Sequence, residues 1–507
     1  MSEVYEAAPP LAEITEDWQR LDRRTIFVAP LMPMLSVLGA VALIVVVRGW
    51  AKVSFWEPAI TGGIAVALFI HSAWRWKTTR YRVTDTHVEM HSGVVTRKRR
   101  SVTRDRVRAV DISANVFHRV FGISVVTVGT GRHVSDAGDE IKLDSVSTVE
   151  VEHLRRMLMR RTTSGPLVQD GRLTKFTTEW LRYAPLTVIG FVAVLVAVGG
   201  LTQLGRTVGI KLWDTKFSHT IYDWYAREPL PLTILVTAAI VLVLSMILSV
   251  AVYAVIYWGF ELTRRDGALH VQYGLLTKRS VAIEERRLRG VKVDEPLLLR
   301  AVGGAKVTAV ATGLGKKKGE DEKWEVDANL LLPQAPHGEA NRVVAEVLRV
   351  RPAPTEATLV KHPRAAARRL IMWSTLIFAV PAIVMGVLSA VDLTPDWIWE
   401  VLLVLVPVGV LYGIGEYHGL GHTLSGDFLV CREGVTPRVT VAVQRTGIVG
   451  WKIRQSFFQR RLRLITVGAT VAAGSGAYYV RNANQDDGLS VADVAVPDLL
   501  APFLERY

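Results

Sequence analysis

Five basic side chains crowd into one short stretch of this chain, and they could bind phosphate or another anion. They are Arg97, Lys98, Arg99, Arg100 and Arg104, which fall within eight positions. A basic residue held near an anionic membrane surface is attracted to it by about 1 kcal/mol. The cluster is therefore a candidate site for lipid headgroups. The alternative is a solvated loop whose charges only set membrane topology, and both interpretations stay open.

Weaker versions of this cluster occur twice more. The residues around Gly93 read YRVTDTHVEMHSGVVTRKRRSV, and those around Gly274 read FELTRRDGALHVQYGLLTKRSVAI. The second stretch carries only Lys278 and Arg279 in the corresponding place, and a third stretch carries only Arg438. We include Lys278 and Arg279 as candidate headgroup ligands, and we expect the first copy to dominate the binding.

The usual signatures of catalysis and metal binding are missing from the sequence. It contains no HExxH, CxxC or GxSxG motif and no glycine-rich phosphate loop, and its 12 histidines are scattered. His87 and His91 lie at an even spacing in a strand pattern, but no third ligand is evident, which favours surface histidines over a metal site. We therefore assign no catalytic residue, no metal and no cofactor, and we expect the protein not to be an enzyme.

The basic balance of the chain does not indicate nucleic acid as a partner. The formal net charge is +14, and the sequence pI is about 9.8. Membrane topology accounts for this excess, and no recognition helix or pattern of stacking aromatic residues accompanies it. We expect no nucleic-acid partner.

Long apolar segments must position these basic stretches. Four of them, 25–47, 183–201, 229–260 and 370–391, carry no charged residue, and two weaker ones, 53–74 and 397–415, contain Glu57 and Glu400. Each is long enough to span roughly 30 Å of hydrocarbon as a helix. A run such as LTILVTAAIVLVLSMILSVAVYAVIYW has no polar face, which is typical of helices that face lipid. We predict six transmembrane helices in three pairs.

Basic residues beside these segments predict their orientation. They gather on one side, where Arg23, Arg24, Arg75, Lys77, Arg264, Arg265, Arg368 and Arg369 lie. The positive-inside rule puts that side in the cytoplasm, so both termini and all three soluble blocks are expected there. Acidic residues before the first span argue against a cleaved signal peptide. The single cysteine, Cys431, fits a reducing compartment.

Each helix pair is followed by the same kind of block, so the chain is a triplication. Strands that alternate apolar and polar residues come first, and a short amphipathic helix closes the block. The expected closing helices are 145–161, with Val151, Leu154 and Leu158 on one face, then 337–350, and finally the segment VPDLLAPFLERY at the end of the sequence.

The predicted organisation has nine parts, which alternate membrane and soluble segments. They are a cytoplasmic segment (1–24), helix pair 1 (25–74), module 1 (75–162), a linker (163–182), helix pair 2 (183–260), module 2 (260–350), a linker (351–368), helix pair 3 (369–416) and module 3 (417–507). The fold class is thus a multi-domain membrane protein in which each helix pair precedes an α+β module.

The motifs of the first block resemble a known family. The Tyr81-led strand, the hairpin SGVVTRKRR, the segment RDRVRAVDI and the strand entry VFHRVFGISVVTV are similar to the bacterial pleckstrin-homology-like (bPH2) module. A helix pair followed by such a module, three times over, resembles the YdbT-type membrane proteins. The likeness weakens along the chain, and in the third copy Arg463 stands where the others have Gly122 and Gly303.

This resemblance implies a fold, a location and a partner. Each PH-like module would be a bent barrel or two-sheet sandwich of antiparallel strands, closed by its C-terminal helix. The protein would be a multi-pass protein of the bacterial inner membrane. A relative with one helix pair and one module would be its protein partner, and tolerance of membrane-active peptides would be the process.

We therefore expect a non-enzymatic integral membrane protein whose three cytoplasmic modules bind lipid headgroups or protein partners at the inner leaflet. The modules would scaffold an envelope complex, and their weak contacts would add through avidity. One alternative is a subunit of a transporter or exporter, although the spans have few polar residues beyond His71 and Glu400. The other alternative is a membrane-embedded enzyme whose site converges from distant segments.

Overall fold

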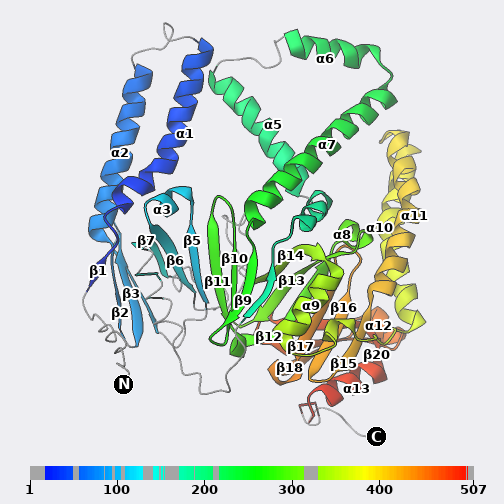
Figure 1. Ribbon diagram of the computed structural model, residues 1–507. Helices are drawn as coiled ribbons and strands as arrows, with labels where there is room; N and C mark the ends of the chain where they lie inside the picture. Colours follow the sequence, from blue (N-terminus) through cyan, green and yellow to red (C-terminus); the bar gives the residue numbers. More distant parts are fainter. Residues whose placement is uncertain are drawn as a thin grey trace, which may run out of the picture. The chain divides into compact units, whose positions relative to one another are not determined.

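The computed structural model of the chain describes most of its residues (Figure 1). The described residues are 18–48, 56–84, 86–93, 97–103, 109–129, 141–147, 150–151, 154, 171–187, 189–208, 216–312, 329–497 and 499–500. The chain forms two compact units. The first comprises Met1–Gly165, Val194–Val241 and Gly274–Ala282, and the second comprises Pro166–Ala193, Leu242–Tyr273 and Ile283–Tyr507. The first unit thus contains module 1 together with a short hairpin segment of module 2.

Helices occupy all six segments that were predicted as spans. They are α1 (Thr25–Arg48), α2 (Trp56–Thr78), the 3-10 helix η3 (Thr178–Leu186) with α5 (Ile189–Val208), α7 (Leu230–Tyr257), α10 (Arg364–Ser389) and α11 (Asp396–Gly419). Among the described residues, α7, α10 and α11 are long and apolar enough to cross a membrane. The pair of η3 and the first part of α5, bent by 72°, would make a fourth span. Six spans therefore stay a prediction.

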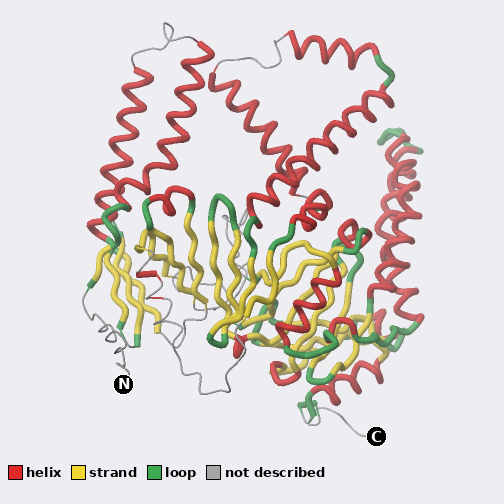
Figure 2. The backbone as a smooth tube through the Cα atoms, in the orientation of Figure 1, coloured by secondary structure: helices red, strands yellow, loops and turns green. Residues whose placement is uncertain are grey.

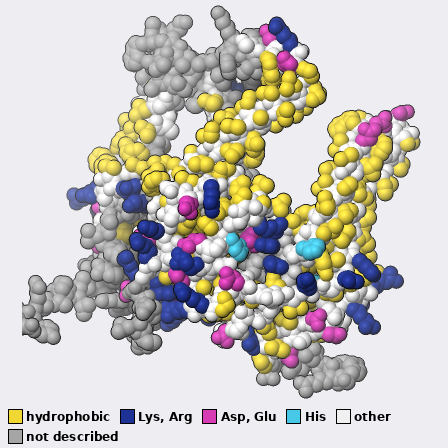
Figure 3. Space-filling model, turned by 45° about the vertical axis from the view of Figure 1, so that its right-hand side comes forward, with side chains coloured by type: hydrophobic (Ala, Val, Ile, Leu, Met, Phe, Trp, Pro, Cys, Tyr) yellow, Lys and Arg dark blue, Asp and Glu magenta, His cyan; other side chains and the backbone are white. Residues whose placement is uncertain are grey.

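The long helices expose apolar side chains over most of their surface. Only 11% of the most apolar window of α7 is buried, and the same fraction holds for α11. In Figure 3 hydrophobic side chains cover the helical rods, while Lys and Arg gather on the strand-rich parts. Apolar surface of this extent is stable in hydrocarbon and not in water, which fits helices that lie in a bilayer.

Helices α10 and α11 pack closely because α11 carries two glycines at the contact. A Cβ on Gly409 would lie 2.6 Å from the carbonyl oxygen of Ser374, and a Cβ on Gly413 would lie 2.6 Å from the Cα of Ile371. Small residues spaced four apart allow this kind of approach between membrane helices. The GxxxG pattern of the sequence therefore marks a real helix contact within the third pair.

Module 1 is a sandwich of two antiparallel sheets (Figure 2). The first sheet has the order β1 (Gln19–Arg20), β2 (Arg80–Val83), β3 (His87–Ser92) and β4 (Lys98–Thr103), and the second contains β5 (Ala109–Ala114), β6 (Ile123–Gly129) and β7 (Ile141–Ser147), with α3 (Val116–Val120) between β5 and β6. Val88 and Val102 of the first sheet share one core with Val126 and Leu143 of the second. Leu154 of the predicted closing helix is also buried there, and most of that helix lies outside the described residues.

Modules 2 and 3 repeat this sequence of elements. Module 2 contains β9 (Glu261–Arg265), β10 (Ala268–Tyr273), β11 (Lys278–Glu284), η5 (Glu285–Arg287), β12 (Leu288–Glu295), α8 (Leu297–Ala301), β13 (Gly304–Ala311), β14 (Leu330–Pro336) and α9 (His337–Leu348). Module 3 contains β15 (Gly421–Ser425), β16 (Phe428–Glu433), β17 (Arg438–Gln444), η7 (Arg445–Gly447), β18 (Ile448–Arg454), α12 (Phe457–Arg461), β19 (Leu464–Val471), β20 (Ala477–Asn484) and α13 (Gln485–Ala495). The antiparallel strands and the closing helix of the prediction are thus present in both.

The closing helix of module 2 is confirmed and that of module 3 was wrongly placed. Helix α9 packs on β13 and β14 and buries Val343 and Val344 completely. In module 3 the described closing helix is α13, and Leu499 and Leu500, in the segment predicted as helical, are not helical, while residues 501–507 of that segment lie outside the described residues. The pattern was hidden by Gly488, a helix-weakening residue that is needed because a Cβ there would lie 2.9 Å from Ile465.

The strand entry of module 3 keeps the turn of the other two modules. Gly122 and Gly303 have φ angles of +66° and +73°, and Arg463 adopts φ +51° at the same place. The left-handed region is unfavourable for a residue with a Cβ by roughly 1–2 kcal/mol. The surrounding strands therefore impose the turn even where the glycine has been replaced, and β19 begins normally at Leu464.

The predicted N-terminal segment and the two predicted linkers each supply an extra strand or bridge to the module that follows. In module 1, Gln19 of β1 pairs with Tyr81. In module 2, β8 (Gly171–Lys175) pairs with β9, and in module 3, Val360 forms an isolated bridge with His422. Each helix pair is therefore inserted between two strands of its own module. A further helix, α6 (Lys216–Arg227), lies between α5 and α7 and was not predicted.

Candidate functional site

Strands β3 and β4 hold the basic cluster of module 1. They pair antiparallel, with Met90 opposite Arg100. Because successive side chains of a strand point to opposite faces, Lys98, Arg100 and the buried Val102 share the inner face, whereas Arg99 lies on the outer face. Charges that are contiguous in the sequence are therefore divided between two faces of the hairpin.

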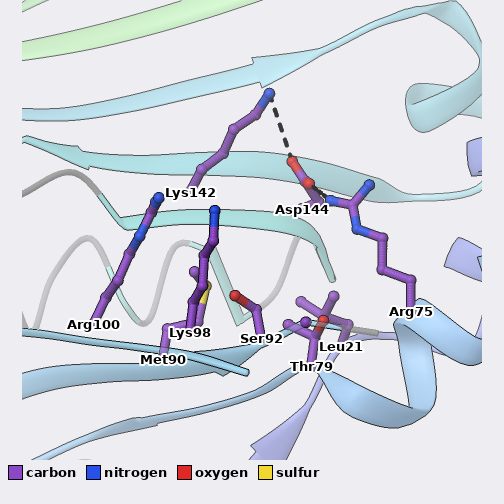
Figure 4. Close-up of a pocket in the computed structure, with 10 residues that line it drawn as sticks. Leu21, Arg75, Thr79, Met90, Ser92, Lys98, Arg100, Lys142 and Asp144 are labelled. Carbon is purple, nitrogen blue, oxygen red and sulfur yellow. Dashed lines mark hydrogen bonds and ion pairs between the residues drawn. The ribbon is translucent and has the colours of Figure 1, made fainter. Parts of the chain in front are cut away.

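The inner face borders a cavity of about 340 Å³ (Figure 4). Ten of the described residues line it: Leu21, Arg75, Thr79, Met90, Ser92, Gly93, Lys98, Arg100, Lys142 and Asp144. Figure 4 shows Lys98 and Arg100 extending from the β3–β4 hairpin toward the side on which Lys142 and Asp144 lie. Four segments that are distant in the sequence, namely the residues before α1, the end of α2, the hairpin and β7, thus meet at one place.

Four cationic side chains and one carboxylate line this cavity. Arg75, in the last turn of α2, forms an ion pair with Asp144. The Nζ atom of Lys142 lies 3.8 Å from the Oδ1 atom of the same carboxylate. Among the described lining residues, cationic side chains therefore outnumber carboxylates. Guanidinium and ammonium groups beside hydroxyl donors such as Ser92 suit a phosphate, because charge-assisted hydrogen bonds to its oxygens are strong.

The other predicted ligands lie elsewhere. Arg97 is exposed at the start of the β4 side of the hairpin. Arg99 lies opposite His91, whose ring stacks on Trp18 with 4.1 Å between the ring centroids. Arg104 falls outside the described residues.

Lys278 and Arg279 of module 2 lie on a strand that is paired with module 1. Lys278 is exposed on β11 and stands opposite Ala114 of β5. The Nη2 atom of Arg279 lies 3.6 Å from the Oδ2 atom of Asp111. The structure therefore places these two residues at a junction between modules, away from the cavity.

Sequence reasoning missed three charged residues of the cavity. Arg75 was interpreted only as a topology signal, and Lys142 and Asp144 were not singled out. The sequence gives little indication that these residues belong to the site. Lys142 and Asp144 lie in an ordinary strand pattern, and they approach β4 only because the two sheets pack together. A basic residue in the last turn of α2 was the only local sign that the end of this helix adjoins a charged site.

Modules 2 and 3 lack this set of cations. Aligned on Gly93 and Gly434 and on the strand registers, module 3 has Val439 for Lys98, Val441 for Arg100, Tyr479 for Lys142, Glu416 for Arg75 and Arg481 for Asp144. In module 2, Ile256 and Val281 stand where module 1 has Arg75 and Arg100, whereas Arg279 stands at the position of Lys98. Module 3 also has a cavity at this place, of about 710 Å³, but other cations line it, namely Arg369, Arg454 and Arg481 beside the carboxylate of Glu416.

Module 3 instead buries two histidines near the start of α10. The Nδ1 atom of His422 lies 3.0 Å from the Nε2 atom of His362, and the Nδ1 atom of His362 lies 3.2 Å from the carbonyl oxygen of Asn482. Burial, and then the charge of His362, lower the pKa of His422 to about 4. Burial also lowers the pKa of His362. In the described part of the chain no group of three or more His, Cys, Asp or Glu residues could hold a metal ion.

Comparisons with known proteins match this architecture. The family model described as "Bacterial PH domain" matches three times, over residues 27–162, 188–343 and 375–501. Each match therefore begins within a helix pair and runs through the strands that follow it.

One curated protein is similar over most of the chain. It is the "UPF0699 transmembrane protein YdbT" of Bacillus subtilis (strain 168), which is 23% identical over 446 residues, covering 83% of this chain and 85% of that protein. Its name mentions a membrane and no reaction. No solved structure matches the chain.

Proposed function

The chain belongs to the bacterial PH domain family, and from this premise we propose that it is an integral membrane protein whose first module binds the phosphate of anionic lipid headgroups. The membrane assignment agrees with the apolar helices and with the transmembrane relative. The resemblance to YdbT-type proteins, deduced from motifs, also agrees with these matches. Headgroup binding goes beyond family membership and rests on the cavity of module 1.

The cationic cavity at the end of α2 is the observation that carries the proposal. Arg75 occupies the last turn of α2, so a membrane-spanning α2 would hold the cavity next to the headgroups. Lys98, Arg100 and Lys142 supply positive charge to the same space. With about 1 kcal/mol for each basic residue near an anionic surface, three such residues amount to roughly 3 kcal/mol, which is enough for a weak but selective contact.

We place the three modules on the cytoplasmic side of a six-span protein. Helix α2 ends in Arg75 and Lys77, and α10 begins with Arg364 and carries Arg368 in its next turn. The positive-inside rule favours the cytoplasm for these ends. The parts of the protein are then the nine segments given by the sequence, located in the inner membrane of a bacterium.

Modules 2 and 3 would act mainly in assembly. Of the four cations of the cavity, module 2 keeps one, Arg279 at the position of Lys98, and module 3 keeps none at the matching positions, so we assign headgroup binding to module 1. A scaffold that holds one lipid-binding module beside two others gains from high local concentration. A link to tolerance of membrane-active peptides follows from the resemblance only.

The test compares two pairs of substitutions in the full-length protein. Lys98→Ala/Arg100→Ala removes two charges from the cavity, and Arg97→Ala/Arg99→Ala removes two from the outer face of the same hairpin. Native mass spectrometry in mild detergent would measure binding of added phosphatidylglycerol, with phosphatidylcholine and inorganic phosphate as comparisons. We expect the first pair to weaken phosphatidylglycerol binding by about 30-fold, since about 2 kcal/mol is lost.

The control pair should change binding little. Equal losses for both pairs would show a diffuse charge effect without a site. Unchanged binding in both would sink the proposal and leave the hairpin as a topology signal. Competition by inorganic phosphate would show that the cavity recognises phosphate itself, whereas its failure would point to the glycerol or acyl part of the lipid.

A further inference from the structure

Two antiparallel strand pairs join the three modules. Strand β11 of module 2 pairs with β5 of module 1 in the first unit, and β17 of module 3 pairs with β12 of module 2 in the second unit. In both cases the later module contributes the strand that follows its hairpin glycine, namely β11 or β17. That strand pairs with β5 or β12, which is the next strand along the chain after the hairpin of the earlier module. The modules are therefore linked through their β-sheets as well as through the chain.

The two junctions have the same register. Lys278 stands opposite Ala114 in the first, and Arg438 stands opposite Glu295 in the second. Counted from Gly274 and Gly434, Lys278 and Arg438 hold the same position. Two independent pairs with one register indicate that this edge is built to accept a strand in a defined alignment.

Ion pairs strengthen both junctions. In the second, the Nε and Nη2 atoms of Arg438 each lie 2.8 Å from an oxygen of Glu295, a carboxylate that is almost fully buried. In the first, the Nη2 atom of Arg279 on β11 lies 3.6 Å from the Oδ2 atom of Asp111 on β5. A basic strand thus meets an acidic edge in each case.

Strand β18 is the third edge of this kind. Its pairing with β19 repeats that of β12 with β13, including the register shift between Ile448 and Gly450 that matches the shift between Leu288 and Gly290. It is the outermost strand of its sheet, whose order is β18-β19-β20. Within the described residues no strand covers its outer edge, whereas β12 is covered by β17.

Two matched positions show the space that a strand would fill. A Cβ on Gly290 would collide with the carbonyl oxygen of Ala442 on β17, while a Cβ on Gly450 would have nothing within 4 Å. Val293 of β12 is 2% exposed, and the equivalent Ile453 of β18 is 44% exposed. The edge of β18 has the form of the occupied edge but lacks its partner among the described residues.

We propose that the outer edge of β18 binds an antiparallel strand of another protein, and that this strand carries acidic side chains. In the register of the internal junctions, the residues that face the incoming strand include Lys452 and Arg454, which are both exposed. At the other junctions, Asp111 and Glu295 supply acidic edges for basic strands. The edge of β18 has the opposite sign, so it selects an acidic partner.

The same charges reject a second copy of this chain. The strand of module 1 that corresponds to β11 and β17 is β4, which is the outermost strand of its own sheet. Docked on β18 of another copy in the same register, β4 would put Lys98 opposite Arg454 and Arg100 opposite Lys452. Like charges directly opposite on paired strands are destabilising. The charges therefore favour a heterologous partner over a chain of identical copies.

Two fluorescent peptides test the proposal on the full-length protein in mild detergent. One is residues 434–444, which contain β17, with Val439→Glu and Val441→Glu so that carboxylates face Arg454 and Lys452. The other is residues 93–103, which contain β4. We expect the acidic peptide to bind about tenfold more tightly than the basic one, from two cross-strand charge pairs.

The variant Gly450→Val should abolish binding of the acidic peptide, because its side chain fills the space of the incoming backbone. Gly171→Val is the control, since a Cβ there also meets nothing within 4 Å. Binding that survives Gly450→Val, or equal binding of both peptides, would overturn the proposal. The lipid measurement does not depend on this edge, so the two proposals can fail separately.

A charge reversal gives a second, independent test. Lys452→Glu/Arg454→Glu makes the edge of β18 acidic, so we expect β4 of another copy to bind there and the variant to self-associate. Adding Gly450→Val to the same chain should block this binding and restore the mass of the unassociated protein. Light scattering would measure the mass. In the chain with its native charges, cross-linking between copies through Arg99→Cys and Ile453→Cys would show that the partner is a second copy, which would overturn the proposed partner. A charge-reversed variant that does not self-associate would count against strand binding at the edge of β18.

Discussion

Module 1 and module 3 share one backbone design and differ in the charges at equivalent positions. Module 1 joins Arg75 of α2 to Asp144 of β7, whereas module 3 has Glu416 and Arg481 at these places. Ser145 and Asn482, which follow the two strand residues, both have left-handed backbone, with φ angles of +67° and +55°. The fold thus constrains the turn and leaves the charge free to change, so the equivalent surfaces of the two modules differ in charge.

The interior of the two modules differs in the same way. Tyr81 and Leu21 of module 1 correspond to His422 and His362 of module 3. Module 1 buries an apolar residue and a phenol whose pKa is raised by burial and then by Glu150. Module 3 buries two imidazoles that are uncharged when folded. Module 3 should therefore respond more strongly to mild acid than module 1, in which burial lowers the pKa of the partly buried His118.

The largest predicted effect is this acid sensitivity. Burial lowers the folded-state pKa of His422 to about 4, below the usual value near 6.5, so the stabilising contribution is present above pH 6.5 and is lost as the pH falls toward 4. The loss is about 3 kcal/mol if His422 titrates alone. Hydrogen exchange of the β15 and β16 amides between pH 7 and pH 4.5 would measure it.

The matched control for this prediction replaces His362 and His422 by their counterparts in module 1, Leu21 and Tyr81. His362→Leu/His422→Tyr should remove most of the pH dependence of exchange in module 3 and leave module 1 unchanged. Asp487 opposes the effect by raising the pKa of both histidines, so Asp487→Asn should increase the acid sensitivity. Persistence of the dependence in the double variant would assign it to other groups.

A smaller effect is expected from inverting the ion pair of module 1. Arg75→Glu sets two carboxylates side by side with Asp144, and it should destabilise the module by about 1 kcal/mol, because the Arg75 side chain is 46% exposed and solvent screens the pair. Arg75→Glu/Asp144→Arg copies the arrangement of module 3 and should recover the loss. A double-mutant cycle on thermal stability would measure the coupling, and additive losses would show that the two side chains do not interact.

The smallest effect concerns the turn at which β19 begins. Arg463→Gly should stabilise module 3 by up to about 1 kcal/mol, because glycine relieves the left-handed strain at φ +51°. Gly303→Ala should destabilise module 2 by a similar amount, since φ is +73° there although space is open around it. Chemical denaturation of both variants would decide whether the three turns are equivalent, and a destabilised Arg463→Gly variant would show that the arginine side chain has contacts that outweigh the strain.

The membrane character and the triplication could be predicted from the sequence, because both are local. Apolar runs reveal spans by length alone, and Gly93, Gly274 and Gly434 mark the same hairpin three times because each has positive φ. The closing helix of module 3 could not be predicted in this way. Gly488 lowers its helical propensity and is retained because α13 packs against Ile465 and Val467.

The apolar helices, the repeated strand patterns and the clustering of Arg97, Lys98, Arg99 and Arg100 could be predicted, since each of these is set by neighbours along the chain. The directions in which the members of that cluster point depend on how distant segments pack. Strand alternation sends Lys98 and Arg100 into the cavity, and the packing of the two sheets brings Lys142 and Asp144 to meet them. The pairing of β12 with β17 and the open edge of β18 likewise depend on contacts between distant segments, which no local pattern encodes.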